Sequence, residues 1–485
     1  MEKKQGQLVR SVTLSAATIL VVSSVIGSGV YKKVAPMSGK MVETVLPDGS
    51  KVMEYVGLMS PKLVLMAWIL GGIVSLFGAL SNAEIGGMMA DSGGEYVYFK
   101  RIYNKFTAFL WGWTTFAVIK TASISSIAYV FAQSFNNLVP LPRLDESVEQ
   151  IKFLGIFQPF ESIGVKALSI ILILILTYIN TKGLKGGASI SEWLTKLVIG
   201  GLSLIVISGL FFGGGSLSNI TTPSVHYVER SWFDPAFLSA MFTAMLAAFW
   251  GYEGWNTLGF MAGEIKEPNR NLPLALAGGL AIIITAYLLV NFTYLYVMPI
   301  DKIMAIPAGK IAAVEVIRSF AGNGGAMLLS ILILITTLGC TNATILMPPR
   351  VYWAMAKDGL FFKSAAHIDP VSNTPNNAIW IQGIWACLLV LSGSFDQLTD
   401  MLIFAAFVFY GATALGVFIL RVKEPRAERP YRVWGYPFVP AIFILFCIGL
   451  VANTIISQPR EAGIGLALIL SGVPFYWYWT RNDEK

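Results

Sequence analysis

The sequence predicts an all-α membrane protein that crosses the bilayer many times, and three observations support this fold class. The chain has 485 residues, of which 55% are hydrophobic and only 13% are charged, whereas soluble domains carry about 25% charged residues. Apolar runs of about 20 residues, the length of a spanning helix, recur from end to end. These runs are continuous and do not alternate with polar residues, so they do not fit a β-barrel.

Hydropathy divides the chain into twelve spans. The first span lacks a small-residue cleavage site and eleven others follow it, so we interpret it as mature structure and not as a signal peptide. The predicted spans cover residues 12–35, 62–83, 107–136, 164–181, 190–213, 237–260, 273–298, 326–347, 376–393, 398–420, 437–456 and 462–479.

The basic residues predict the orientation. An even number of spans places both termini on one side, and segments on that side hold about 20 Lys and Arg against about 13 on the other. The densest basic loop, 421–432, lies on the side of the termini. We therefore predict cytoplasmic termini and an integral protein of the plasma (inner) membrane, in contact with the lipid bilayer. The net charge of +7 reflects this loop bias and not nucleic-acid binding, which would need a basic soluble domain.

Loops and cysteines indicate little further chemistry. Residues 41–56 alternate short apolar and polar side chains around a Pro-Asp-Gly turn, which predicts a small extracellular β-hairpin of unassigned function. The three cysteines, Cys340, Cys387 and Cys447, all fall in predicted spans. We therefore expect no disulfide, no metal site and no cofactor.

The first span carries a break. Gly27, Ser28 and Gly29 interrupt its helix near the middle of the membrane, and Lys32 and Lys33 follow. In hydrocarbon, non-helical backbone is tolerated only where protein buries it or where it lines a wet cavity. The free N–H groups at the start of a half-helix favour an anion, and free C=O groups at the end of another favour a cation. A broken span can therefore hold an amino-acid zwitterion, although small residues also mark close helix packing.

The sixth span repeats the feature. Its sequence AAFWGYEGWNTLGF, residues 247–260, contains Gly251, Gly254 and the acidic Glu253. Paired interruptions in corresponding spans indicate a transporter site built from inverted repeats. Because spans one and six are five apart, we predict a single transporter domain over 1–485. It would comprise repeat one at about 12–213, repeat two at about 237–420 and two extra helices at about 437–479.

With these paired breaks, the chain resembles the L-type amino acid transporter branch of the amino acid–polyamine–organocation superfamily. The resemblance covers nearly the whole chain and implies a LeuT-type arrangement of 5+5 inverted repeats. The motifs that carry it are VIGSGVY (25–31), NAEIGGMMADSGGEYVYF (82–99), KTASISSIAYVFAQSF (120–135), LTKLVIGGL (194–202), GYEGWNTLGFMAGEIKEPNRNLPLA (251–275), RVYWAMAKDGLFFKSAAHIDPVSNTPNNA (350–378) and LRVKEPRAERPYRV (420–433).

The resemblance implies a substrate site between spans one and six. The substrate carboxylate would meet Ser28 and Gly29 beside Gly27, and the ammonium would meet backbone carbonyls of Val25, Trp250 and Gly251. These positions are the predicted substrate-binding residues, together with Glu253 and Asn256.

Three of these positions carry more specific expectations. Trp250 would be an aromatic gate over the substrate, with a satisfied core tryptophan as the alternative. Asn256 would steady the broken segment by hydrogen bonds. Glu253 departs from many relatives, and two roles stay open for it. We favour satisfying N–H groups of the unwound stretch over titrating to couple protons.

Lys196 and Lys120 lie well inside predicted spans. Resemblance implies that the Lys196 ammonium sits between spans one, five and eight, where sodium-driven relatives hold an ion, with Thr341, Asn342 or Thr344 as partners. This would make transport independent of sodium, unless Lys196 only snorkels to the interface. Lys120 is nearer the bilayer centre, and the sequence does not reveal its partner.

We therefore predict that the chain is not an enzyme. It would be a sodium-independent secondary transporter of amino acids, expected to exchange neutral L-amino acids by alternating access. The alternatives are a proton-coupled symporter of amino acids or polyamines and, more remotely, a non-transporting amino acid sensor. No nucleotide-binding motif occurs, and no disulfide-linked subunit is expected because no cysteine lies in an extracellular loop. The substrate, the coupling and the oligomeric state are not encoded in recognisable form.

Overall fold

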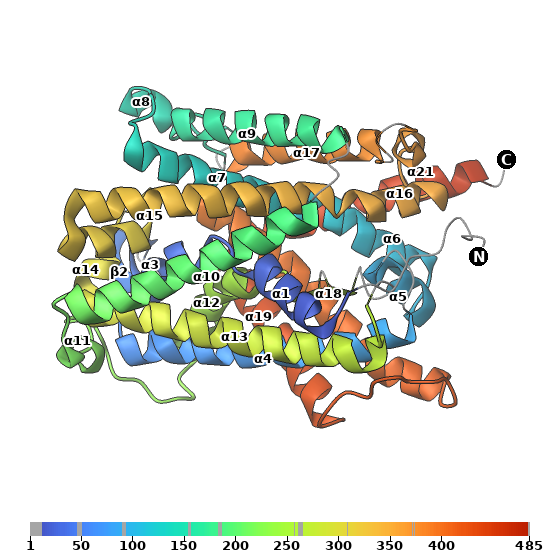
Figure 1. The fold of residues 1–485 in the computed structure, drawn as a ribbon, viewed down its shortest axis with the longest axis horizontal. Coiled ribbons are helices and arrows are strands. Elements are labelled where there is room, and N and C mark those ends of the chain that lie inside the picture. The colour runs from blue at the N-terminus through green and yellow to red at the C-terminus, as the bar shows by residue number, and fades with distance from the viewer. Residues whose placement is uncertain are drawn as a thin grey trace.

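The chain folds into a bundle of long helices that run side by side along one axis (Figure 1). The computed structural model describes residues 12–45, 51–89, 94–153, 157–182, 187–256, 258–259, 265–307, 309–370, 372 and 374–483. The first half contains α1 (Leu14–Val25), α2 (Gly29–Lys32), α3 (Val34–Ser38), β1 (Lys40–Val45), β2 (Lys51–Val56), α4 (Pro61–Met88), α5 (Glu95–Ile102), α6 (Lys105–Thr114), the π-helix η1 (Thr115–Ile119), α7 (Lys120–Leu138), α8 (Glu146–Glu149), α9 (Ile163–Thr181), α10 (Gly187–Phe212) and α11 (Leu217–Thr221).

The second half has the same helical character. It contains α12 (Pro235–Tyr252), α13 (Pro268–Val297), α14 (Ile300–Met304), α15 (Ala312–Leu346), α16 (Pro349–Lys357), the 3₁₀-helix η3 (Lys363–Ala366), α17 (Asn376–Ser392), α18 (Phe395–Lys423), α19 (Phe438–Ser457), α20 (Pro459–Leu470) and α21 (Gly472–Asp483).

Local sequence signals start several of these helices. Pro61 and Pro235 occupy the first turns of α4 and α12, where a proline lacks an N–H that the helix could not use anyway. The Asp234 carboxylate accepts from the Ala236 N–H at 2.7 Å and so caps α12. Ser394 and Gln397 form a capping box at the start of α18.

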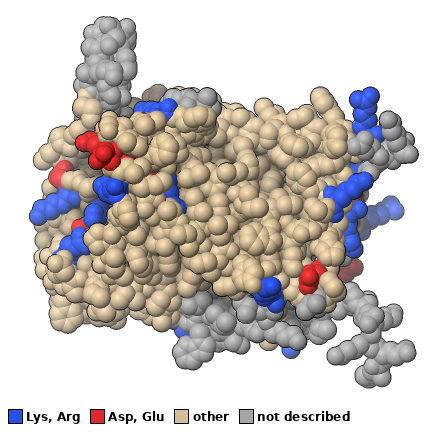
Figure 2. Space-filling view, turned by 90° about the horizontal axis from the view of Figure 1, so that it is seen from above, with Lys and Arg blue, Asp and Glu red and all other residues tan. Residues whose placement is uncertain are grey.

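Helix lengths agree with the predicted spans. Within the described residues, nine helices are long and apolar enough to cross a membrane, and three shorter apolar helices cover Leu14–Val25, Lys196–Phe212 and Asn376–Ser392. Charged side chains gather toward the two ends of the long axis, and the middle of the face in Figure 2 is largely uncharged. An uncharged belt between two charged ends is what a bilayer requires of its protein surface.

Two predicted spans differ in detail from the structure. The sixth was predicted to continue to residue 260, but α12 ends at Tyr252, since Gly254 has a φ of +119° that a helix cannot accommodate. The twelfth is present as one span over Pro459–Arg481, with a turn at Ser471 that divides it into α20 and α21.

The predicted hairpin is present. Strands β1 and β2 pair antiparallel, with Lys40 opposite Val56 and Val45 opposite Lys51. The Pro-Asp-Gly turn itself lies outside the described residues. The hairpin packs at the end of the bundle opposite the two termini, beside α3 and α14 (Figure 1).

The helices that surround the two broken spans form the core. Helix α1 packs against α10 and α13, α12 against α4, α18 and α19, and α15 against α7. The arrangement as two five-helix repeats plus two helices stays a prediction.

Candidate functional site

The first span is interrupted where the glycines predict it. Helix α1 ends at Val25, and Ile26 has an extended ψ of 97°. The next helical turn, α2, begins only at Gly29. The N–H groups that open a helix have no partner in the preceding turns. The break therefore places backbone that belongs to no regular helix inside the bundle.

The sixth span is interrupted as well. Helix α12 ends at Tyr252, Glu253 takes an extended ψ of 139°, and Gly254 has positive φ. A Cβ at Gly254 would lie 2.3 Å from the carbonyl oxygen of Ser24. The hydroxyl of Ser24 also donates to the Gly254 carbonyl at 3.2 Å. The second break is thus held directly against the end of α1.

The two broken spans touch through their main chains. A Cβ added to Gly29 would lie 2.6 Å from the Cα of Gly251 and 2.9 Å from its nitrogen. No side chain fits between the helices at this crossing. Close helix packing, the alternative explanation of these glycines, is therefore present together with the break.

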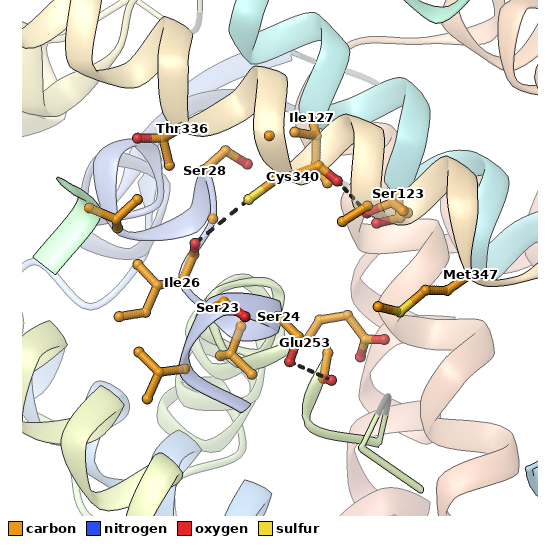
Figure 3. A pocket seen from close by; sticks show the side chains of 18 of the residues that line it. Ser23, Ser24, Ile26, Ser28, Ser123, Ile127, Glu253, Thr336, Cys340 and Met347 are labelled. Atoms are coloured by element: carbon orange, nitrogen blue, oxygen red, sulfur yellow. Dashed lines mark hydrogen bonds between the residues drawn. The ribbon is translucent and has the colours of Figure 1, made fainter. Parts of the chain in front are cut away.

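A cavity of about 150 Å³ lies beside the two breaks (Figure 3). It extends toward the end of the bundle that carries both termini, because Leu20, Met347 and Pro348 belong to its wall. The wall combines α1, α7, α10, α15 and the end of α12, and its residues are Leu20, Val22, Ser23, Ser24, Val25, Ile26, Gly27, Ser28, Lys120, Ser123, Ile127, Val198, Ile199, Trp250, Glu253, Gly254, Leu258, Thr336, Gly339, Cys340, Ala343, Thr344, Met347 and Pro348.

The predicted site residues divide into two groups. Five of them line the cavity: Val25, Gly27, Ser28, Trp250 and Glu253. The other three, Gly29, Gly251 and Asn256, do not belong to its wall. Gly29 and Gly251 form the helix crossing, and the Asn256 amide donates to the buried carboxylate of Glu95 at 3.3 Å. Their roles toward a substrate stay predictions.

Two of the carbonyls predicted to receive an ammonium converge on one point. The hydroxyl of Tyr287 on α13 lies 2.8 Å from the Gly251 oxygen and 3.2 Å from the Val25 oxygen. A hydroxyl has a single proton, so it satisfies one of these two acceptors at a time. The sequence analysis missed Tyr287, because a tyrosine in a span gives no signal of the carbonyls that it meets.

Trp250 separates the cavity from the opposite end of the bundle. Its indole N–H donates to the Ser28 hydroxyl at 3.2 Å, and its ring contacts Phe395 edge-on at 5.9 Å between centroids. The indole N–H thus has a hydrogen-bond partner, as expected of a core tryptophan. The ring also lies over the break, as expected of an aromatic gate, so the structure is consistent with both interpretations.

Charged side chains close that opposite end. The Lys33 ammonium, on a side chain only 1% exposed, lies 2.7 Å from Asp396 and 3.6 Å from Asp400, and it donates to Thr399 at 2.7 Å. The neighbouring Lys32 donates to Gln133 at 2.7 Å. These contacts join the half of the first span that is farther from the termini to α18 and α7. We call Lys33, Asp396, Thr399 and Asp400 the outer ion cluster, where outer means the end of the bundle opposite the termini.

Glu253 is the partner of Lys120 that the sequence did not reveal. Their charged groups lie 3.4 Å apart, and the side chains are 7% and 10% exposed. The Tyr410 hydroxyl on α18 lies 2.9 Å from both carboxylate oxygens. Helix α7 begins directly after the π-helix η1, whose wider turn shifts Lys120 relative to a regular helix. The contacts described for the Glu253 carboxylate are with side chains and not with N–H groups of the unwound stretch, so both predicted roles of Glu253 stay predictions.

The described contacts do not test the predicted sodium-site surrogate. Lys196 lies on α10, which packs against α1 and α15, and its side chain is exposed. The Thr341 hydroxyl donates to the Thr337 carbonyl of its own helix at 2.7 Å. The Asn342 oxygen accepts from Asn180 on α9 at 2.7 Å. The role of these three residues therefore stays a prediction.

The second cavity and the acidic, histidine and cysteine side chains offer less for binding an amino acid or a metal. A second cavity of about 570 Å³ lies between α10 and α13, and its wall is aliphatic apart from Ser203 and Thr285. It offers no charged group for a zwitterion. Among the described residues, no group of three or more His, Cys, Asp or Glu side chains could hold a metal ion.

A helical bundle with two broken spans beside a mid-bundle cavity is the architecture of a secondary transporter. Comparison with known proteins identifies the kind. The amino acid permease family matches residues 12–477, so the chain belongs to this family. It is an integral membrane protein that transports amino acids, and not an enzyme.

Several relatives match over nearly full length. The chain is 29% identical to the serine/threonine exchanger SteT of Bacillus subtilis (strain 168), over 98% of both chains. It is 29% identical to the human b(0,+)-type amino acid transporter 1, over 99% of this chain and 90% of the relative. It is 28% identical to the mouse large neutral amino acids transporter small subunit 2, over 98% and 83%.

Proposed function

We propose that the protein exchanges neutral L-amino acids across the plasma (inner) membrane by alternating access, without sodium. The observation that carries the proposal is the pair of broken spans that meet beside a cavity closed at one end by Trp250 and the outer ion cluster. A carrier must be closed on one side while it is accessible from the other.

The chemistry of the cavity supports a neutral substrate. Its hydroxyl groups, from Ser23, Ser28, Ser123, Thr336 and others, carry no charge, and its two charged groups, Lys120 and Glu253, neutralise each other. Relatives named as a serine/threonine exchanger and a large neutral amino acid transporter agree with this substrate class. A zwitterion without net charge would leave the charge of this wall balanced.

We place both termini in the cytoplasm on the basis of the Lys and Arg bias of the loops. We further propose that no subunit is attached by a disulfide. All three cysteines of the chain lie in the helices α15, α17 and α19. A cysteine inside a span is not available to a partner outside the membrane.

Counterflow in proteoliposomes tests the proposal. We expect labelled serine, threonine or a larger neutral amino acid to enter only vesicles preloaded with an unlabelled substrate. Replacing sodium by choline should leave the rate unchanged. Liposomes without protein are the control, and competition by a panel of twenty amino acids defines the substrate. Saturable binding without flux would contradict exchange and identify a sensor.

A proton-coupled symporter of amino acids or polyamines is the second candidate. The observation that favours it is the carboxylate of Glu253 on the cavity wall. An imposed pH gradient would then drive uptake into empty vesicles, which exchange does not predict.

A further inference from the structure

A second carboxylate is buried next to the Glu253–Lys120 pair. Glu95 opens the short helix α5, outside the membrane spans and at the end of the bundle that carries the termini, and it is 2% exposed. One of its oxygens accepts from the Asn82 amide on α4 at 2.7 Å, and the other accepts from the Asn256 amide at 3.3 Å. Glu95 therefore fastens the segment that follows the broken end of α12 to α4.

The charges around Glu95 do not balance. Glu95 interacts electrostatically with Lys120, and with Glu253 as a like charge. Within the described residues, the other titratable groups that interact with it are the hydroxyls of Tyr98 and Tyr410, which are neutral near pH 7. Two carboxylates thus share one ammonium. Burying an uncompensated charge costs several kcal/mol, and a proton on one carboxylate removes that cost.

A polar atom beside Glu95 points to the same conclusion. The Asn256 amide oxygen is buried and has no hydrogen-bond partner within the described part of the chain. An ionised carboxylate is only an acceptor and cannot satisfy the amide oxygen, whereas a protonated carboxyl can donate to it once the amide turns over. Burial raises the pKa of Glu95 to about 7, although Lys120 opposes the shift.

We propose that Glu95 is a proton-binding site that controls the movement of residues 253–256 and hence the rate of exchange. A hydronium ion gives its proton to the carboxylate, so one O–H bond of the hydronium breaks, one O–H bond forms on Glu95, and a water molecule remains. The net charge of Glu95, Glu253 and Lys120 then goes from −1 to zero. Glu253 and Lys120 also line the cavity, so this cluster borders it.

The direction of the effect follows from desolvation. Alternating access requires the cavity to close at the terminus end, which removes water from the three charged groups. Closing over an unbalanced carboxylate is costly, whereas closing over a neutral cluster is not. Protonated Glu95 should therefore exchange faster. This inference rests on the proposed exchange function and concerns its control, not its driving force.

The test measures counterflow at equal pH on both sides of the membrane, from pH 5.5 to 8.5. For a single group with a pKa of about 7, the protonated fraction falls about tenfold between pH 6 and pH 8. We expect the wild-type rate to fall by about the same factor. Glu95→Gln, which resembles the neutral acid, should be fast and independent of pH. Glu95→Asp should keep a pH dependence with a displaced midpoint.

The matched control is Glu424→Gln, which removes a carboxylate on the surface at the same end of the bundle. It should keep the wild-type pH profile. A wild-type rate that does not change between pH 6 and 8, or an unchanged profile in Glu95→Gln, overturns the proposal. A profile that stays unchanged in Glu95→Gln but disappears in Glu253→Gln would identify Glu253 as the titrating group instead. Absence of any counterflow in the wild type would instead refute the exchange function.

A second measurement does not depend on transport or on a well-folded variant. A carboxyl with a raised pKa binds more protons in the folded than in the unfolded protein, so stability falls as pH rises from about 4.5 to 7. We expect the Tm of the wild-type protein in detergent to fall across this window, and the fall to be smaller in Glu95→Gln or Glu95→Asp. Infrared difference spectra of the wild type should also show a protonated carboxyl band that disappears as the pH is raised across this window. Absence of this band would overturn the proposal.

Discussion

The two ends of the bundle are closed by different means. At the end opposite the termini, Lys33 forms ion pairs with Asp396 and Asp400 while almost fully buried. At the end with the termini, Leu20, Met347 and Pro348 line the cavity, and the buried ion pair between Glu84 and Arg429 does not belong to its wall. The two ends of the cavity therefore differ in this state. A cluster of buried charges lies beyond Trp250 at one end, whereas the described wall toward the other end is uncharged apart from Lys120 and Glu253.

This asymmetry gives the proposed exchange cycle a defined barrier. To admit substrate from the opposite side, the outer ion cluster must separate and Trp250 must move away from Phe395. Ions that leave each other into water lose little, because hydration replaces the pairing. The outer ion cluster can therefore hold the end shut and still open on the timescale of transport.

Lys33→Met should have the largest effect on this comparison. It leaves Asp396 and Asp400 facing each other without a cation, and losing one partner of a buried pair costs about 3 kcal/mol or more. We expect most transport to be lost. Cys340, which lines the cavity, should become reactive toward an impermeant thiol reagent from the outer side, in a background with Cys387→Ala and Cys447→Ala.

Lys62→Met is the matched control, since Lys62 is exposed at the start of α4 near the same end. It should not change the labelling. The triple variant with Asp396→Asn and Asp400→Asn removes the unpaired charges and should recover part of the closure. Outer labelling of Cys340 that is equal in the wild type and Lys33→Met would disprove the sealing role.

Gly29→Ala tests the point where the two broken spans meet between the ends. Its Cβ would fall 2.6 Å from the Cα of Gly251, and main chain cannot move aside as a flexible side chain can. Overpacking of this kind costs about 1–3 kcal/mol. We expect a lower Tm in detergent and slower counterflow.

Gly200→Ala on α10 provides the comparison, because a Cβ there has nothing within 4 Å. Alanine is favoured over glycine in a helix by about 0.5–1 kcal/mol, so this variant should be slightly more stable. If both variants behave alike, the close approach of the two spans has no energetic consequence.

Arg101→Gln should have the smallest effect. Arg101 pairs with Glu424 at the terminus end, and the two side chains are 38% and 32% exposed. Exposed ion pairs contribute about 0–1 kcal/mol and weaken in salt. We expect a Tm within a few degrees of the wild type, and a difference that shrinks further in high salt. A loss as large as that of Lys33→Met would remove the contrast between the two ends.

Features that depend on neighbouring residues could be predicted from the sequence. Gly27 and Gly254 marked the two breaks, and the Pro-Asp-Gly turn marked the hairpin formed by β1 and β2. Helical fold class followed from composition alone. In each case the physical cause, a backbone preference or an apolar run, lies within a few residues of its effect.

Partners far apart in the chain could not be predicted. Lys120 and Glu253 are 133 positions apart, and Lys33 and Asp396 are 363 apart. Glu95 belongs to a motif that carries the family resemblance, but its role could not be predicted, because it depends on contacts with Asn82 and Asn256 that form only in the fold. A single sequence does not indicate which distant residues will be in contact. The charge balance of the site therefore became visible only in the folded structure.

The π-helix η1 has a consequence for how the chain tolerates insertions and deletions. Its turn holds one residue more than a regular helix would. A residue added to a regular α-helix would rotate everything beyond it by about 100°, and the wider turn of η1 absorbs that rotation. Deleting one residue within 115–119 should therefore restore a continuous α-helix in which Lys120 still faces Glu253 and Ser125 still donates to the Ala386 carbonyl on α17. The third span can thus lose one amino acid here and keep its partners, whereas a deletion in the regular part of α7 would displace every contact beyond it.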